Sequence, residues 1–355
     1  MSRPQDPHRA SFTFGNPFRM MKPKGDSYLC PGLLALLNAF EERLAQRLRK
    51  LRPENKDDIL SLSWMQLAME LLIETHNDIK SLITDLVLPV CDWDDKWIDV
   101  YLNNSVMLLD ISIAFSSEIS RLNQGNLMLK CALHNLNSDS STQFIQARSS
   151  IDGWKKYMCV KNPKLENCCT VLGSLVESLD QPKVKNSTKG KVLMRAMYGV
   201  KAETVFICGV FTAAFTGSSQ KLIDLSIPDT YMWADALTQT QSIINEEIRL
   251  IYSAGRQSAV KDLEAIDTVV KKLYPMIEEN SSGINAHELK DTVSHLEKNA
   301  EDLSKGLDLL TTKVDGFFQT VLTGRDALLC NLRATSPVFG ARDGNSTSVG
   351  QQIVR

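Results

Sequence analysis

Apolar residues near the C-terminus of this 355-residue chain repeat with the spacing of one long helix. Between Leu289 and Val321 they follow one another at alternating steps of four and three, the a/d pattern of a heptad helix. The set is Leu289, Val293, Leu296, Ala300, Leu303, Leu307, Leu310, Val314, Phe317 and Val321. We expect this seam to be covered inside an antiparallel bundle of the same chain, and pairing between two chains is the alternative.

Most of the remaining sequence also favours helix. Leu, Ala, Glu, Lys and Gln dominate, whereas Val, Tyr and Thr form no sustained alternating runs, and this composition is typical of helices. Helices are expected over 31–51, 57–88, 93–122, 126–136, 142–160, 165–180, 192–215, 231–253 and 258–279. The sequence therefore predicts an all-α fold, an elongated bundle of long antiparallel helices with a heptad-patterned C-terminal helix.

The two ends of the chain differ in composition from its middle. Residues 1–28 contain four prolines and a few basic and aromatic residues, which predicts a disordered arm. Residues 333–355 are polar and rich in Gly and Ser, which predicts a disordered tail. The helical bundle domain is expected between them, over residues 29–332.

Turn-forming residues also interrupt the expected bundle. The triplet Asn123-Gln-Gly125 predicts a break after the helix at 93–122. A basic hinge is expected near residues 181–191, and a connector that contains Gly, Ser and Pro is expected at 216–230. These interruptions predict where the bundle changes direction.

The segment from Val205 to Phe215 is apolar apart from Thr212. A bilayer crossing needs about 20 predominantly apolar residues, and an upstream extension of this segment meets Lys201 and Glu203. We therefore expect the buried central helix of the bundle, and a membrane-associated or spanning segment is the alternative. The residues concerned are Val205, Phe206, Ile207, Cys208, Gly209, Val210, Phe211, Thr212, Ala213, Ala214 and Phe215.

Residue types that carry chemistry do not form a recognisable motif. Cys131 and His134 would lie one helical turn apart, but a zinc site needs about two more ligands in comparable register. Cys168 and Cys169 are adjacent and would point in different directions on a helix. His76 is not part of a His-Glu-x-x-His motif. The sequence therefore predicts no catalytic residue, no metal site and no cofactor site.

Two segments are candidates for contact with partners. The segment STKGKV at 187–192 lacks the first glycine and the hydroxyl of a phosphate-binding loop, so its basic character is interpreted as electrostatic. A cluster of this kind can meet anionic lipid or an acidic partner, and a solvated hinge is the alternative. The cluster is Lys183, Lys185, Lys189, Lys191 and Arg195. In the arm, Asn16-Pro17-Phe18 resembles the tripeptide that EH domains of endocytic adaptors bind.

Net charge and cysteine content indicate which partners and which cellular compartment to expect. A net charge of −2 provides no global basic field, so nucleic acid is not expected as a partner. Met1 is not followed by the apolar core of a secretory signal, so we expect an intracellular protein with reduced, mostly buried thiols. The cytosol is favoured, with the endoplasmic-reticulum membrane next and the plastid less favoured.

Segments spread along the chain resemble the plant BYPASS family. They are RPQDP, FGNPFRM, DDILSLSWMQLAME, LPVCDWDDKWIDVYL, LNQGNLMLKCALHNL, ARSSIDGW and PKVKNSTKGKVLMRAMYGVKAETVFICGVFTAAF. The resemblance implies a regulator of root and shoot development that prevents production of a root-derived, carotenoid-related mobile signal. It defines no catalytic residue, and the membrane segment proposed for the family would fall on Val205–Phe215.

Residues and resemblance together favour a non-enzymatic regulatory or adaptor protein. One alternative is an enzyme of small-molecule metabolism that acts on the mobile signal, which would need a pocket where groups such as Cys131 and His134 meet an acid. A second alternative is an adaptor of vesicle traffic, because a related plant group is similar to partners of the exocyst. Protein partners and contact with a membrane surface are therefore expected, and the oligomeric state is left open.

Overall fold

The computed structural model describes residues 29–86, 95–138, 142–179, 187–255, 260–278 and 286–335. Its helices are α1 Pro31–Lys50, α2 Leu62–Leu86, α3 Asp95–Leu136, α4 Gln143–Cys159, α5 Pro163–Glu177, α6 Thr188–Thr216, α7 Ala234–Ser253, α8 Lys261–Glu278 and α9 Ala286–Thr335. These described residues form helices and connections without strands, which confirms the all-α fold. The arm at 1–28, including Asn16-Pro17-Phe18, lies outside the described residues, as does the tail from 336 onward.

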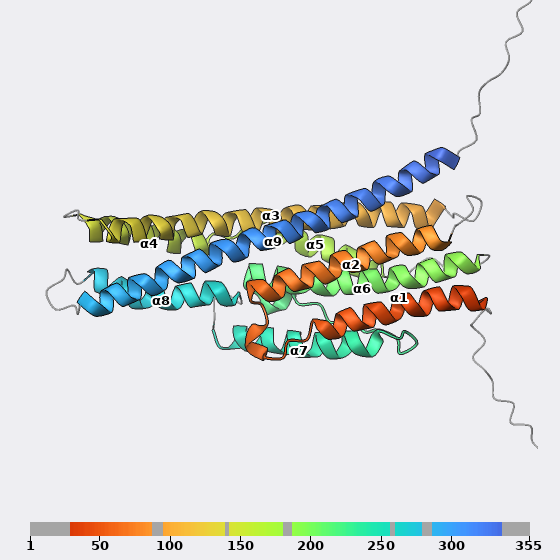
Figure 1. The fold of residues 1–355 in the computed structure, drawn as a ribbon, viewed down its shortest axis with the longest axis horizontal. Coiled ribbons are helices and arrows are strands. Elements are labelled where there is room, and N and C mark those ends of the chain that lie inside the picture. The colour runs from red at the N-terminus through yellow and green to blue at the C-terminus, as the bar shows by residue number, and fades with distance from the viewer. Residues whose placement is uncertain are drawn as a thin grey trace, which may run out of the picture.

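Most helices lie along one long axis, so the molecule is an elongated bundle (Figure 1). Helices α3 and α9 run antiparallel over much of its length and pack against each other. Toward one end, α4 packs on α3 and α8 packs on α9. Toward the other end, α2 and α6 pack together beside α1, and α7 packs against α1. The two long helices therefore connect both ends of the bundle.

The heptad seam of α9 is covered by helices of the same chain. Helix α9 packs against α2, α3 and α8. Leu289 and Val293, at the start of the seam, are half-buried. The buried members of the seam are Leu296, Ala300, Leu303, Leu307, Leu310, Val314, Phe317 and Val321. The expectation that the seam packs within its own bundle therefore agrees with the structure.

Helix α3 is continuous, so the predicted break at Asn123-Gln-Gly125 is wrong. A Cβ added at Gly125 would lie 3.2 Å from the sulfur of Met158, so this glycine lets α4 approach closely. The next residue, Asn126, is buried and its Nδ2 donates to the carbonyl oxygen of Ala300 at 2.8 Å. These turn-forming residue types serve helix contacts here, because tertiary packing overrides local propensity.

Several helix ends also differ from the prediction because distant groups cap them. Helix α2 begins at Leu62 and not at residue 57; residues 56–58 form a short 3-10 turn instead. The backbone N–H of Leu62 donates to Asp262 of α8 at 2.9 Å, so the cap comes from another helix. Helix α6 begins at Thr188, so the hinge expected near 181–191 is helical from that residue onward.

Helix α6 lies between α1, α2, α5 and α7, and forms the centre of its end of the bundle. Every residue from Val205 to Ala214 is buried, and Phe215 is half-buried. Among the described residues, Ile98–Leu136 and Thr188–Thr216 are long and apolar enough to cross a membrane. The apolar window of the second is 89% buried within the bundle, which is typical of a core helix. The membrane alternative for Val205–Phe215 stays a prediction.

Candidate functional site

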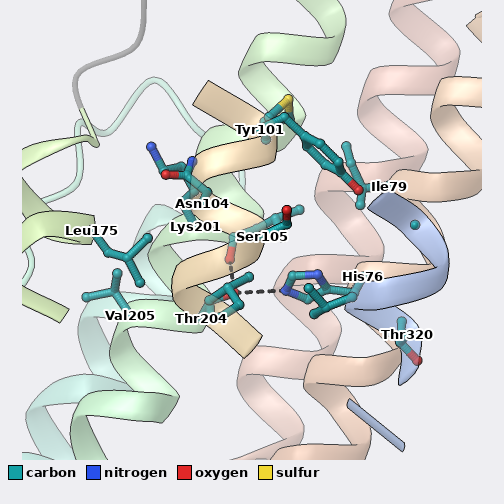
Figure 2. A pocket seen from close by; sticks show the side chains of 15 residues that line it. His76, Ile79, Tyr101, Asn104, Ser105, Leu175, Lys201, Thr204, Val205 and Thr320 are labelled. Carbon is teal, nitrogen blue, oxygen red and sulfur yellow. Dashed lines mark hydrogen bonds between the residues drawn. The ribbon is translucent and has the colours of Figure 1, made fainter. Parts of the chain in front are cut away.

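A cavity lies inside the bundle where α2, α3, α5, α6 and α9 meet (Figure 2). It leaves ≈ 50 Å³ for the centres of water-sized molecules, which is room for about three waters. Its walls combine aliphatic side chains with several polar ones. The main polar groups are His76, Tyr101, Asn104, Ser105, Lys201 and Thr204.

His76 of α2 faces Thr204 of α6 across this cavity. The Thr204 hydroxyl donates to the carbonyl oxygen of Val200 at 2.6 Å, so it accepts from His76 Nε2, which lies 3.1 Å away. Burial lowers the pKa of His76 to about 4. The imidazole ring also meets Phe317 edge-on at a centroid distance of 5.1 Å. His76 is therefore a neutral hydrogen-bond donor at pH 7 and a weak base.

Lys201 of α6 brings a cation to the cavity. Its side chain is buried, with 7% of the residue exposed, and its Nζ donates to the carbonyl oxygen of Ser178 at the C-terminal end of α5. Burial lowers the pKa of Lys201 to about 8, so most of it is protonated at pH 7. The negative end of the α5 dipole favours this charge. Within the described part of the chain, Lys201 forms no ion pair.

Helix α3 contributes the other donors. Asn104 is 7% exposed, and its Nδ2 has no hydrogen-bond partner within the described residues. Ser105 donates to the carbonyl oxygen of Leu102 at 2.6 Å and accepts from Arg325 of α9 at 2.9 Å. Burial raises the pKa of Tyr101, which keeps its hydroxyl protonated. The amide of Asn104 is thus a buried donor of this lining that has no hydrogen-bond partner among the described residues.

This arrangement is suited to binding an acceptor. Among the described residues, the lining contains a cation, a neutral imidazole and several hydroxyl or amide donors, but no carboxylate. Ser105 and Thr204 both donate to backbone carbonyls of their own helices, so neither is activated by an adjacent base. The chemistry of the cavity is therefore recognition of a group that carries oxygen acceptors.

The structure does not bring together the residues that the enzyme alternative required. Cys131 and His134 are both exposed on α3 and do not line the cavity. The described residues contain no cluster of three potential metal ligands. Sequence reasoning treated His76 only as a histidine outside a zinc motif and Lys201 only as an interruption of an apolar run. The signal that it missed was a charged residue within an otherwise apolar helix.

The basic cluster is only partly described. Lys183 and Lys185 lie outside the described residues, whereas Lys189, Lys191 and Arg195 are half-buried in the first turns of α6. Arg195 Nε donates to Glu41 of α1 at 2.5 Å, and its Nη2 donates to a connector carbonyl at 2.6 Å. Arg195 is therefore part of a contact between helices, while contact of the lysines with a partner or lipid stays a prediction.

The thiols are less buried than the sequence predicted. Among the described cysteines, Cys168 and Cys208 are buried and Cys169 is half-buried. Burial raises the pKa of Cys168 to about 11 and raises that of Cys208 well above its usual range. The exposed thiols are Cys30, Cys131, Cys159 and Cys330. The expectation of mostly buried thiols is wrong, because these four lie on outward-facing sides of their helices or before the first one.

A second polar group is buried on the side of α6 that faces α1 and α2. Glu203 is fully buried, and neither carboxylate oxygen has a hydrogen-bond partner within the described residues. Burial raises the pKa of Glu203 to about 8, although the Thr75 side chain and the positive charge of Arg47 both act to lower it. Arg47 already donates to Asp78 at 2.5 Å and to Glu74 at 3.1 Å. Glu203 is therefore mostly a neutral carboxylic acid at pH 7.

Comparison with known proteins identifies relatives over most of the chain. Residues 167–332 match the family model of "Protein ROH1-like". The chain is 52% identical to "Protein BPS1, chloroplastic" of Arabidopsis thaliana, with 94% of each protein covered. It is 36% identical to "UPF0496 protein 4" of Oryza sativa subsp. indica, with 94% of this chain and 97% of that protein covered.

The comparison also identifies a more distant relative. "Protein ROH1D" of Arabidopsis thaliana is 19% identical, with 82% of this chain and 87% of that protein covered. No solved structure matches the chain. The identity to the BPS1 protein, sustained along nearly the whole of both chains, confirms the resemblance found in the sequence. The chain belongs to the plant BYPASS family.

Proposed function

We propose that this BYPASS-like developmental regulator is non-enzymatic and prevents production of a root-derived, carotenoid-related mobile signal that arrests shoot growth. The observation that carries the non-enzymatic part is the lining of the cavity. It offers the Lys201 cation and the Asn104 amide as donors, and none of its described residues contributes a carboxylate. The developmental part rests on the similarity to the BPS1 protein.

The protonation states of the lining support recognition over catalysis. A general base near neutral pH needs a pKa close to 7, whereas burial lowers the pKa of His76 to about 4 and leaves Lys201, with a pKa of about 8, mostly protonated at pH 7. A nucleophile needs an adjacent base, whereas the Thr204 hydroxyl donates to a backbone carbonyl. We therefore favour a protein that acts by binding, and the enzyme of signal metabolism remains the alternative.

An adaptor of vesicle traffic, in contact with exocyst components, is the second candidate function. This candidate rests on the related plant group that is similar to partners of the exocyst. Its surface would include Lys189 and Lys191 at the start of α6, beside the segment that contains Lys183 and Lys185. Capture of exocyst subunits by the wild-type chain, but not by a chain with these four lysines changed to glutamine, would support this candidate. Equal capture by both chains would count against the lysines as its contact surface.

For localisation we propose the cytosol and the endoplasmic-reticulum membrane, with the plastid as the alternative. The Arabidopsis relative is named as a chloroplastic protein, and this supports the plastid alternative. A fluorescent protein fused to the C-terminus leaves the N-terminal arm free. Fluorescence inside plastids would overturn the cytosolic proposal.

The developmental function is tested by grafting. A root that lacks this protein, grafted beneath a wild-type shoot, is expected to arrest that shoot, whereas the reciprocal graft grows normally. Expression of the wild-type chain in the root should restore growth. A shoot that grows normally on the deficient root would contradict a root-derived signal under the control of this protein.

Enzymatic action is tested in the same grafts with His76→Gln. This change removes the imidazole base of the lining, yet it retains a hydrogen-bond donor toward Thr204. A regulator that acts by binding should still restore growth. Failure of His76→Gln to restore growth, with protein levels on immunoblots equal to wild type, would favour the enzyme.

A further inference from the structure

We propose that the cavity where α2, α3, α5, α6 and α9 meet is a binding site for a small aliphatic carboxylate, held by the Lys201 ammonium and the Asn104 amide. This inference deepens the proposed function by naming the class of ligand that the regulator senses, and it rests on that function only for its biological meaning. Neither Lys201 nor Asn104 was predicted from the sequence as a binding residue. Both side chains line the cavity and lie in the same part of Figure 2.

The Lys201 ammonium has donors to spare. An ammonium group carries three N–H donors, and the one hydrogen bond of this group within the described residues goes to the carbonyl oxygen of Ser178. A buried cation is unfavourable unless an anion compensates it. Since no carboxylate of the described part of the chain lines the cavity, an anionic ligand would supply the missing charge.

Asn104 is an independent indication of an acceptor. Buried amide groups are nearly always hydrogen-bonded, but the Nδ2 of Asn104 has no partner among the residues that the structure describes, while only 7% of Asn104 is exposed. A carboxylate carries two oxygens that each accept hydrogen bonds. One ligand group can therefore satisfy both the ammonium and the amide.

The walls and the size of the cavity select the rest of the ligand. Aliphatic side chains of Leu108, Leu175, Val200 and Val205 line it beside the polar groups. Phosphate or sulfate would place oxygen atoms against these walls, whereas a short hydrocarbon tail would pack on them. Space for about three waters fits a carboxylate of about five or six non-hydrogen atoms.

Thermal unfolding of the full chain with sodium butyrate tests the proposal. Sodium chloride keeps the ionic strength constant, and butyramide serves as the uncharged analogue. A ligand that binds the folded state raises Tm by mass action. Butyrate should raise Tm in a saturable manner, with half-saturation on the order of 1 mM given so few ligand atoms, and butyramide should not. No shift with butyrate, or an equal shift with butyramide, would overturn the proposal.

Variants assign the binding to the two residues. Lys201→Met should weaken butyrate binding at least about tenfold, the factor that loss of one charged contact brings. Lys221→Met, which removes an exposed cation of the connector, is the matched control and should bind as wild type does. Equal binding by Lys201→Met and wild type would refute the assignment.

Asn104→Asp is a second variant that tests the proposal even if Lys201→Met fails to fold. The new carboxylate would lie where the ligand carboxylate is expected, so this variant should have a higher Tm without butyrate and no response to it. A butyrate response equal to that of wild type would overturn the proposal. Asp180→Asn tests the other source of a carboxylate, the chain itself. If Asp180→Asn responds to butyrate and wild type does not, a side chain of the protein itself pairs with the Lys201 ammonium, and the proposal is wrong.

Binding and function fail separately in these experiments. The unfolding measurements use the purified chain, whereas the grafts measure shoot growth. Absence of butyrate binding together with graft rescue would contradict the carboxylate ligand and support the developmental function. Butyrate binding without graft rescue would support the carboxylate ligand and contradict the developmental function.

Discussion

Glu41 of α1 and Arg195 of α6 lie 154 positions apart in the chain, yet Oε1 of the first accepts from Nε of the second at 2.5 Å. The other oxygen of Glu41 accepts from the backbone N–H of Met232 at 2.9 Å. Glu41 is 1% exposed, and the Arg195 guanidinium also lies 4.7 Å from the centre of the Tyr231 ring. One buried carboxylate therefore joins α1, α6 and the connector before α7.

Loss of this ion pair should destabilise the bundle. Arg195→Gln leaves the buried Glu41 charge without its cation, and we expect the free energy of unfolding to fall by about 2 kcal/mol. This is below the usual range for a broken buried pair because the Arg195 side chain is 32% exposed. Urea unfolding measures the change. The control is Arg49→Gln, which breaks an exposed pair with Glu42 and should cost under about 1 kcal/mol. Equal losses in both variants would contradict this role of Arg195.

Gly306 allows α9 to lie against the start of α2. A Cβ at this position would lie 2.6 Å from Cδ1 and 3.2 Å from Cβ of Leu62, so Gly306→Ala forces the buried Leu62 side chain to move. We expect a loss of about 1–3 kcal/mol in the free energy of unfolding. Gly173→Ala in α5 is the matched control. It meets nothing within 4 Å and should stabilise its helix by about 0.5–1 kcal/mol. The prediction fails if both substitutions change stability in the same direction.

The buried Glu203 should make stability depend on pH. Its pKa is about 8 in the folded chain, compared with 4.5 for an ordinary glutamate, so the folded state retains a proton that the unfolded state has lost. The stability that this provides is complete below about pH 4.5 and is lost as the pH rises to about 8. Each pH unit within this window costs at most about 1.4 kcal/mol.

Glu203→Gln removes this dependence. The variant should gain about 1–2 kcal/mol on wild type between pH 6.5 and pH 8, measured by urea unfolding at several pH values. His76 has a lowered pKa and acts in the opposite direction below pH 6.5, so the comparison is made above that pH. Glu246→Gln, at an exposed position of α7, is the control. Parallel curves for Glu203→Gln and wild type would show that Glu203 is ionised in the folded chain.

The helical fold follows largely from periodic patterns in the sequence. The steps of four and three from Leu296 to Val321 identified the buried face of α9, because one helix presents these positions on one side. The short apolar run that begins at Val205 identified α6 as a buried helix of the bundle. The break predicted at Asn123-Gln-Gly125 failed because contacts with Met158 and Ala300 lie far away in the chain.

The cavity could not be predicted from the sequence. It is assembled from five helices, and no local pattern indicates that His76 of α2 will face Thr204 of α6. Lys201 and Glu203 were visible as charges near an apolar run, but their neighbours decide what each does. The carbonyl of Ser178 holds Lys201 at one side of α6, whereas burial keeps Glu203 mostly neutral at the other.

The burial of α6 is the central claim, because the cavity and the neutral Glu203 both require this helix to lie inside the bundle. Sodium carbonate extraction of membranes from cells that express the tagged full chain tests it most directly. The chain should appear in the soluble fraction or be released by carbonate, and release by high salt alone would indicate electrostatic contact through the lysines. Retention in the carbonate-washed membranes, with release only by detergent, would contradict the account, because Val205–Phe215 would then lie in lipid.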